Sequence, residues 1–211
     1  MRSEATLFVV DDDPAVRDSL TQVATRMQLA AECFPTADEF LCAFDSSRPG
    51  CLVLDIRMPG MDGIELQAKL VEDGIQIPVI IITGHGDVPL GVRAMKQGAV
   101  DFLEKPFQPK QLTECIRKAL SLDARRRDKR YRQDRAESRL RRLTRQEREV
   151  MGRIVAGKPN KVIATELEVS LRTVQYRRAS IMEKMEVESK AALIEAVISA
   201  EATASERAKT S

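Results

Sequence analysis

The most regular feature of this sequence is a set of short, continuous apolar runs in its first half. Residues 7–10, 52–54 and 79–83 are almost entirely Leu, Val, Ile and Phe, without the apolar-polar alternation of a half-exposed strand. Short runs rich in β-branched residues are typical of parallel strands that helices cover on both faces. The shorter run 101–105 follows the same scheme. We therefore predict an α/β domain with a doubly wound parallel sheet.

Each of these runs ends in, or is followed by, a residue with a functional side chain. These residues are Asp11 and Asp12, Asp55, Thr83 and Lys105. Sites in open α/β sheets form at the carboxyl ends of the strands, so we expect these side chains to converge in one crevice. Carboxylates gathered there repel one another unless a hard cation neutralises them or one takes a proton. The pattern predicts a magnesium-dependent phosphoacceptor with Asp55 as the nucleophile.

A simpler structural interpretation applies to some of these positions. A single Asp at a strand end is more often a turn or helix-cap residue than a nucleophile. Asp13-Pro14 is a good helix start, with Asp as the cap and Pro at the first helical position. We expect Asp13 to be structural, whereas the five positions taken together favour a site.

The segment after residue 120 differs sharply in composition. Residues 121–142 are rich in Arg and other good helix formers and contain neither Gly nor Pro. We predict that the last helix of the first domain continues as a charged connector, about 30 Å long at 1.5 Å per residue. Its apolar stripe is thin, so a weak dimeric coiled coil and a solvated single helix both remain open. Such arginine runs are more often solvated surface than DNA contacts.

The pattern beyond residue 142 predicts a helix-turn-helix. Thr144 and Glu147 form a capping box before an apolar face that ends at Gly157. Asn160 and Ser170 are expected to cap the next two helices, of which the second is longer and has exposed basic and amide groups. Three residues on one face of that longer helix are expected to be core: Val174, Ile181 and Met185.

Composition limits the alternatives. A chain of 211 residues makes two modest domains, and its net charge of +2 hides a concentration of arginines in the second half, which suggests a nucleic-acid partner. The four cysteines lack metal-ligand or disulfide spacing. His85 is the only histidine, so a metal site built from several histidines is excluded, and we expect His85 to be a loop residue and not a catalyst. No signal peptide or apolar run long enough to span a bilayer is recognisable, and we expect a soluble, cytoplasmic protein without a membrane partner.

The order Asp-Asp, Asp, Thr and Lys-Pro closely resembles the receiver domain of two-component response regulators, from about residue 6 to 120. The stretches 83–89 and 96–107 are similar to the FixJ branch. The resemblance implies a five-stranded, flavodoxin-like sheet. It also implies a Mg²⁺ ion ligated by Asp12, Asp55 and the backbone carbonyl of Arg57, with Asp11 holding it through water.

The same resemblance implies roles for other residues near the strand ends. Thr83 would hydrogen-bond a phosphoryl oxygen and Lys105 would pair with its charge. Phe102 occupies the aromatic position that swings inward as Thr83 moves, although an aromatic residue on a short strand is usually core. The peptide bond from Lys105 to Pro106 is expected to be cis.

Residues from about 143 to 199 resemble the LuxR-type four-helix DNA-binding domain. The match lies in Leu143-Thr-x-x-Glu-x-Glu-Val, Gly157-x-x-Asn-Lys-x-Ile-Ala, Ser170-x-x-Thr-Val and Ile181-Met-x-Lys-Met. Gln175, Tyr176 and Ala179 occupy positions that approach base edges in that family. The residues better placed for phosphates are Lys161, Arg172, Thr173, Arg177 and Arg178. Departures from the commoner pattern at Pro159, Gln175, Arg177 and Ser180 leave the recognised DNA sequence unpredictable from the family.

Together these resemblances predict a transcription regulator that a sensor histidine kinase phosphorylates on Asp55 and that binds double-stranded promoter DNA, with paired half-sites. The expected domains are a receiver (1–120), a helical linker (121–142), a helix-turn-helix domain (143–200) and a disordered tail (201–211). Phosphorylation is expected to produce a homodimer through a face formed by Val92, Met95, Lys96 and Asp101, unless Val92 and Met95 are ordinary core residues.

Two other function classes compete with this interpretation. An aspartyl-phosphate phosphohydrolase commonly needs a second acid two residues after the nucleophile, and that position is Arg57 here. A protein-binding module would have little use for an arginine-rich exposed helix. We therefore expect a regulator and not an enzyme.

Overall fold

The structure is a computed structural model of the chain that describes residues 5–84 and 88–208. The chain forms two compact units, Met1–Arg127 and Asp128–Ser211. Each unit has its own apolar core and is described by itself below. Among the residues that the structure describes, no helix is long and apolar enough to cross a membrane.

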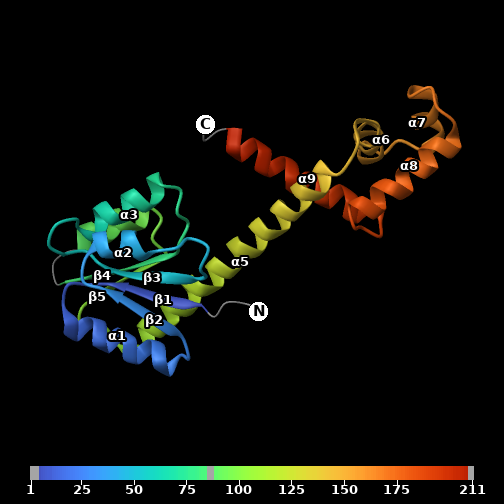
Figure 1. The fold of residues 1–211 in the computed structure, drawn as a ribbon. Helices are drawn as coiled ribbons and strands as arrows, with labels where there is room; N and C mark the ends of the chain where they lie inside the picture. The colour runs from blue at the N-terminus through green and yellow to red at the C-terminus, as the bar shows by residue number, and fades with distance from the viewer. Residues whose placement is uncertain (1–4, 85–87, 209–211) are drawn as a thin grey trace. The chain divides into compact units, whose positions relative to one another are not determined.

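The first unit is a five-stranded parallel sheet with the strand order β2-β1-β3-β4-β5, as expected for a doubly wound fold. The strands are β1 (Thr6–Val10), β2 (Ala30–Phe34), β3 (Gly50–Asp55), β4 (Val79–Thr83) and β5 (Asp101–Glu104). The helices are α1 (Pro14–Arg26), α2 (Ala37–Ala43), α3 (Gly63–Glu72), α4 (Val88–Lys96) and α5 (Pro109–Arg141). Figure 1 shows α1 on one face of the sheet and α2 and α3 on the other.

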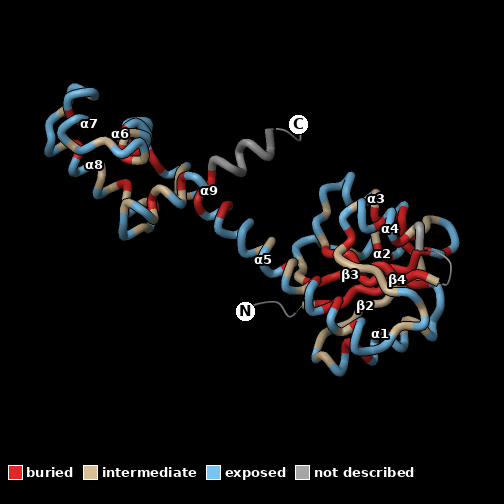
Figure 2. The backbone as a smooth tube through the Cα atoms, turned by 180° about the vertical axis from the view of Figure 1, so that it is seen from behind, coloured by how far each residue is buried: buried red, intermediate tan, exposed pale blue. Residues whose placement is uncertain are grey.

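The strands are apolar on both sides because each face has its own core. Helices α2, α3 and α4 pack over one face, and α1 and the first turns of α5 pack over the other. Residues of β1, β3 and β4 alternate between the two cores: Phe8 and Val10 face one, Leu7 and Val9 the other. Figure 2 shows this concentration of buried residues in the strands.

Strand register places the functional strand ends side by side. Val10 of β1 pairs with Leu54 of β3, so the residues that follow them, Asp11 and Asp55, emerge at the same edge of the sheet. The chain after β3 must also turn closely past its own backbone. A Cβ atom on Gly63 would lie 2.1 Å from the carbonyl oxygen of Asp55, so only glycine fits where α3 begins.

Helix α5 (Pro109–Arg141) runs without a break into the segment expected to link the domains. Asp123 on this helix is buried and accepts a hydrogen bond of 3.0 Å from the amide of Gly50. Arg127 donates to backbone carbonyls in the loop before β3. Because the first unit extends to Arg127, the beginning of the expected linker 121–142 belongs to that unit.

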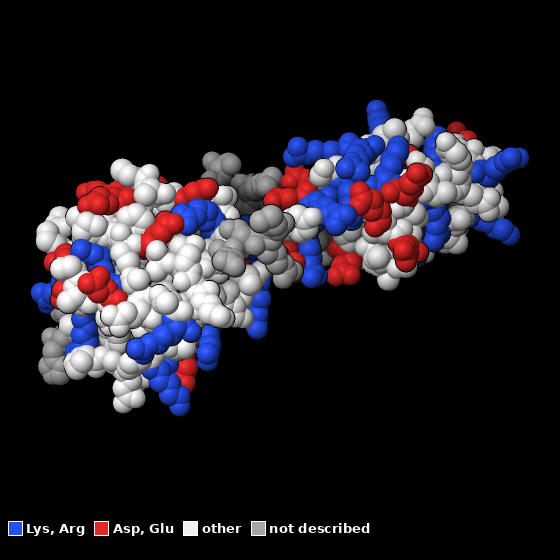
Figure 3. Space-filling view, turned by 60° about the horizontal axis from the view of Figure 1, so that its bottom comes forward, with Lys and Arg blue, Asp and Glu red and all other residues white. Residues whose placement is uncertain are grey.

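The arginines in the second half of α5 are largely ion-paired. Figure 3 shows basic and acidic side chains interspersed on the second unit. The pairs are Arg132 with Asp128, Arg141 with Glu137, and Arg135, Arg139 and Arg142 with Glu186. This pairing favours the solvated-surface interpretation of the arginine run over a continuous contact with DNA.

The second unit adds four further helices after the end of α5: α6 (Arg145–Val155), α7 (Asn160–Glu166), α8 (Leu171–Lys184) and α9 (Lys190–Ala208). The Thr144–Glu147 capping box and the Ser170 cap form as the sequence predicts. Val174 and Ile181 lie in the apolar core, again as predicted. Together α7 and α8 make the expected helix-turn-helix.

Two expectations for this unit were wrong. Asn160 is the first residue of α7 and not its cap, because Pro159 occupies the cap position, and the side chain of Asn160 instead accepts a hydrogen bond from Arg178. Helix α9 continues past Ala200 to Ala208, where a disordered tail was expected. The residues that follow Ala200 include several Ala and Glu residues, which favour helix even without an apolar face. Residues 209–211 of that tail lie outside the described chain.

Candidate functional site

The carboxyl edge of the sheet holds a three-membered charge cluster. The ammonium nitrogen of Lys105 lies 2.8 Å from Oδ2 of Asp11 and 2.7 Å from Oδ1 of Asp55. Asp11 and Lys105 directly follow β1 and β5, and Asp55 is the last residue of β3; the parallel arrangement of these strands brings their ends together. Both carboxylates are buried: Asp11 is 0% exposed and Asp55 is 5% exposed. Lys105 thus bridges two buried acids that the strand ends bring near each other.

The cluster is short of positive charge. Burial raises the pKa of Asp55 above its ordinary value of 3.8, and the nearby Asp11 adds to that rise, whereas the hydrogen bond and charge of Lys105 oppose it. Burial alone would lower the pKa of Lys105, but its hydrogen bonds to Asp11 and Asp55 outweigh burial and raise it. The charge of Lys105 therefore does not fully compensate the burial of Asp55, and a further cation would stabilise the ionised form of Asp55.

The predicted metal ligands are only partly gathered. The side chain of Asp12 is exposed, and Asp55 Oδ2 accepts a hydrogen bond of 2.8 Å from the amide of Arg57. In the described parts of the chain, no three His, Cys, Asp or Glu side chains are grouped as a metal site. The donor set still fits a hard cation, because Asp11 and Asp55 supply carboxylate oxygens and share only one ammonium group, that of Lys105.

The switch candidates occupy the two neighbouring strands. Thr83 is fully buried at the end of β4, and its hydroxyl donates to the backbone carbonyl of Gly84 at 3.3 Å. Phe102 on β5 is half-buried and contacts α4 at Gly91, where an added Cβ would meet its ring at 3.1 Å. The peptide bond from Lys105 to Pro106 is cis, as predicted. His85 lies outside the described residues.

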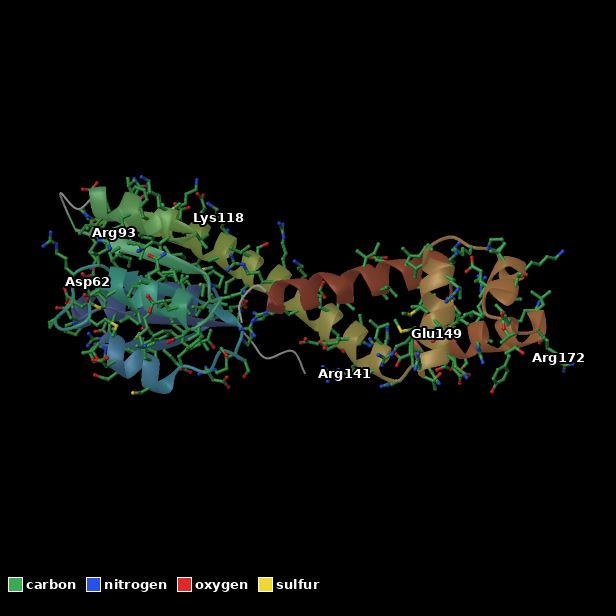
Figure 4. All side chains as sticks on the ribbon, turned by 90° about the horizontal axis from the view of Figure 1, so that it is seen from above. Asp62, Arg93, Lys118, Arg141, Glu149 and Arg172 are labelled. Carbon is green, nitrogen blue, oxygen red and sulfur yellow. The ribbon has the colours of Figure 1, made fainter. Side chains whose placement is uncertain are left out.

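Helix α8 presents the side chains expected to read bases. Gln175, Tyr176 and Ala179 are exposed, and Tyr176 reaches 75% exposure, which is unusual for so large an aromatic side chain. Arg172 is also exposed, and Figure 4 shows it projecting outward from the start of α8. Lys161 on α7 is likewise exposed. These side chains are accessible to a partner in the groove of a duplex.

The remaining phosphate candidates already have partners within the unit. Arg177 donates to Oε1 of Gln146 at 2.6 Å, and Arg178 donates to Oδ1 of Asn160 at 3.2 Å. Thr173 is half-buried, and its amide donates to the hydroxyl of Ser170, the cap of the helix. These partners orient the two arginines without neutralising them, since both acceptors are uncharged amides.

Comparison with known proteins decides the family. Residues 7–117 match the response regulator receiver domain, and residues 141–197 match the bacterial regulatory proteins of the luxR family. The chain belongs to the response regulators. It combines a receiver domain with a LuxR-type helix-turn-helix domain and is a two-component regulator of transcription that binds DNA.

Similar proteins span most of this response regulator. The transcriptional regulatory protein FixJ of Bradyrhizobium diazoefficiens is 42% identical and covers 92% of this chain and 95% of its own. The response regulator protein TodT of Pseudomonas putida is 41% identical, covering 88% and 82%. The solved structure of the response regulator StyR has a TM-score of 0.85 at 44% identity, covering 92% and 98%. Full-length FixJ from B. japonicum has a TM-score of 0.59 at 40% identity, covering 94% and 98%.

The candidate dimer face of this response regulator is accessible. Val92 and Met95 on α4 are 45% and 38% exposed, so the alternative that they are core residues is wrong. Lys96 is exposed as well. Asp101 on β5 forms an ion pair of 3.2 Å with Lys118 of α5, and a contact between Asp101 and a second copy would compete with this pair.

Sequence reasoning missed residues that act through backbone groups or through neighbouring helices. Arg17 on α1 donates to the carbonyl oxygens of Asp11 and Asp12, at 2.7 and 2.9 Å. Glu147 was assigned only a capping role, yet it also binds Lys184 of α8 at 2.7 Å. The only sequence feature that could have indicated the role of Arg17 is a basic residue in the first turn of the helix that follows the acidic pair. No local pattern indicates the bond between Glu147 and Lys184.

Proposed function

We propose that a sensor histidine kinase phosphorylates this response regulator on Asp55 in a Mg²⁺-dependent reaction, and that phosphorylation controls how α8 binds promoter DNA. The observation that carries the proposal is the ion-paired cluster in which Lys105 bridges Asp11 and Asp55. It combines a carboxylate whose ionisation is costly with a cation that could change partners. Because a bacterial chromosome lies in the cytoplasm, the proposal places the protein there.

The proposed chemistry needs little beyond placement and charge. One carboxylate oxygen of Asp55 attacks the phosphorus of a phosphohistidine, the phosphorus–nitrogen bond breaks, and the imidazole leaves. Lys105 then turns from the carboxylate of Asp55 to an oxygen of the new phosphoryl group, and the Thr83 hydroxyl donates to another. In this scheme Asp11, Asp12, Asp55 and the backbone carbonyl of Arg57 would hold Mg²⁺, and the cation would offset the charge that the phosphoryl group brings.

The output side of the proposal rests on the accessible side chains of α8. Gln175, Tyr176 and Ala179 face base edges in the major groove, and a second set contacts phosphates. That second set comprises Lys161, Arg172, Thr173, Arg177 and Arg178. Movement of Thr83 and Phe102 would be transmitted to α4, where Val92, Met95, Lys96 and Asp101 form the contact of a phosphorylated homodimer. Two copies would then bind two half-sites. In domain terms, a receiver (1–120) acts through a helical connector (121–142) on the DNA-binding domain (143–200).

The nucleophile can be tested on the intact protein. Full-length protein is incubated with a small phosphodonor, with and without Mg²⁺, and its mass is measured. The wild type should gain one base-labile phosphate only with Mg²⁺, and Asp55→Asn should gain none. Asp18→Asn, at an exposed position of α1, is the matched control and should behave as the wild type.

Loss of folding would not explain the expected result for Asp55→Asn. Because burial raises the pKa of Asp55, its ionised form is costly in the folded state, and a neutral amide removes that cost. We expect the variant to unfold at or above the wild-type temperature without Mg²⁺. A base-labile phosphate on Asp55→Asn at the wild-type rate would refute the assignment.

A further inference from the structure

Arg17 binds the backbone that carries the two acidic residues of the crevice. It lies in the first turns of α1 (Pro14–Arg26), and one guanidinium nitrogen, Nη1, donates to two consecutive carbonyl oxygens. These carbonyls belong to Asp11 and Asp12 and lie 2.7 and 2.9 Å from the nitrogen. Both distances lie within the range of about 2.7–2.9 Å that is typical of hydrogen bonds from a charged donor. A single side chain thus fixes two successive peptide groups.

These peptide groups lie beyond the end of the sheet, where regular strand pairing no longer holds the chain. Val10 is the last residue of β1 with a ladder partner. After it, the amide of Asp11 donates to the carbonyl of Phe34 at 3.2 Å, and the amide of Asp13 donates to Oδ1 of Asp11 at 2.9 Å. These two bonds use only backbone amides of the turn. Arg17 binds backbone carbonyls of the same turn, so both kinds of backbone group are restrained.

We infer that Arg17 is a positioning residue for the cation site: by holding the carbonyls of Asp11 and Asp12, it orders the turn on which both carboxylates are mounted. The inference rests on the proposed Mg²⁺-dependent phosphorylation. A ligand pair on a mobile turn loses conformational freedom each time it binds a cation, whereas an ordered turn has lost that freedom on folding. Groups that orient metal ligands in this way typically change metal affinity by about 10- to 100-fold when removed.

Because Arg17 is positively charged, the direction of the change in Mg²⁺ affinity distinguishes a positioning role from an effect of charge. A guanidinium near a cation site repels the cation, so an effect of charge alone predicts tighter Mg²⁺ binding when Arg17 is replaced by a neutral residue. Positioning predicts weaker binding. The two explanations therefore differ in the direction of the change and not only in its size.

The first measurement is calorimetric titration of the full-length, unphosphorylated protein with Mg²⁺ alone. Arg17→Ala should raise the dissociation constant about 10-fold, and Arg17→Lys, which keeps a charged donor, should recover part of that loss. Arg26→Ala is the matched control, because Arg26 lies in the last turn of the same helix and is exposed. It should leave the dissociation constant unchanged within about twofold.

Hydrogen exchange of the same proteins without Mg²⁺ provides a second readout. The amides of Asp11 and Asp13 should exchange at least about 10-fold faster in Arg17→Ala than in the wild type, with β3 unaffected. If Arg17→Ala unfolds below the temperature of the titration, Arg17→Met takes its place, since it keeps an aliphatic side chain and loses both the donor and the charge. Unchanged or tighter Mg²⁺ binding, or unchanged exchange at Asp11 and Asp13, would overturn the inference.

Phosphorylation then separates this inference from the proposed function. With a small phosphodonor, Arg17→Ala should need about 10-fold more Mg²⁺ for half its maximal rate, and its rate at saturating Mg²⁺ should stay within about twofold of the wild type. If the wild type itself is not phosphorylated, the proposed function fails. If the wild type is phosphorylated and Arg17→Ala has the same Mg²⁺ dependence, only the role of Arg17 fails.

Discussion

The charged groups of the receiver crevice and the outward-facing side chains of Arg172 and Gln175 on helix α8 are arranged in opposite ways. In the crevice, Lys105 is shared by two buried carboxylates, and each charge has an internal partner. On α8, the side chains of Arg172 and Gln175 are exposed and form no hydrogen bond or ion pair with the described residues. One region is internally paired, whereas the other is open to a partner.

This difference determines how each region can respond to a ligand. A new group in the crevice must exchange with an existing partner, so binding there changes the contacts of Lys105, Asp11 and Asp55. A duplex placed against α8 adds contacts without breaking any made by Arg172 or Gln175. The crevice is therefore suited to switching, and the open face of α8 to recognition.

Removing the shared cation should have the largest effect on stability. Lys105→Met leaves two buried carboxylates facing each other, and we expect the free energy of unfolding to fall by about 3 kcal/mol. Mg²⁺ should restore more stability to this variant than to the wild type, because it replaces the lost positive charge. Chemical denaturation with and without Mg²⁺ measures both effects.

Lys118→Met is the matched control for that experiment. Lys118 pairs with Asp101 at the surface (Figure 4), and its loss should change the free energy of unfolding by less than about 1 kcal/mol. If the two variants lose the same free energy of unfolding, Lys105 stabilises the buried carboxylates no more than a surface lysine stabilises its partner, and the contrast drawn above is wrong.

Glu147 shows that the DNA-binding unit also contains one internally paired charge. Burial opposes its ionisation, yet the hydrogen bonds from Lys184, Thr144 and Ser180 together outweigh burial and lower the pKa of Glu147 to about 2 from its ordinary value of 4.5. Because the folded-state pKa lies below the unfolded one, this stabilisation is fully present above about pH 4.5. It is lost as the pH falls toward 2.

Glu147→Gln should remove that dependence. We expect a loss of about 2 kcal/mol at neutral pH, and a smaller difference from the wild type at each step of acidification below pH 4.5. The readout is α-helical circular dichroism during denaturation at several pH values. Glu149→Gln, at an exposed position of the same helix, should stay within about 0.5 kcal/mol at every pH. A pH-independent deficit in Glu147→Gln would show that packing, not charge, is responsible.

Much of the fold follows from local patterns in the sequence. The uninterrupted apolar runs predict parallel strands because both faces of each strand are covered, and the caps at Thr144 and Ser170 are read from three or four residues. Helix α9 extends further than predicted, to Ala208, and the residues after Ala200 include several Ala and Glu residues, which favour helix. The prediction treated the lack of a core-forming face as a lack of structure.

The sequence predicted which side chains meet at the candidate site only for residues placed by the ends of strands. Asp11, Asp55 and Lys105 converge because parallel strands end at one edge, and this needs no knowledge of side-chain conformations. The pairing of Arg177 with Gln146, and of Arg178 with Asn160, joins separate helices. Such pairs depend on how the helices pack and on rotamers, which a single sequence does not specify.

The open face of α8 yields a prediction about sequence preference. Gln175 should read one base, most plausibly adenine, because its carboxamide can accept from N6 and donate to N7 in the major groove. Gln175→Ala should weaken binding by about 1.5 kcal/mol to sites with the preferred base and relax preference at that position alone. Selection of bound DNA from a random pool by both proteins is the measurement. An unchanged motif would mean that α8 docks differently.

The smallest expected effect distinguishes open arginines from those with internal partners. Arg172 has no partner among the described residues, so a phosphate contact there adds to the complex, and Arg172→Ala should lower the slope of log affinity against log salt by about one. Arg178 already donates to Asn160, so Arg178→Ala should lower the slope less. Neither variant should alter base preference, because phosphates are the same at every step of the duplex. Binding isotherms at several salt concentrations measure the slopes. If Arg178→Ala lowers the slope by one and Arg172→Ala does not, then accessibility in the free protein does not identify the residues that meet DNA.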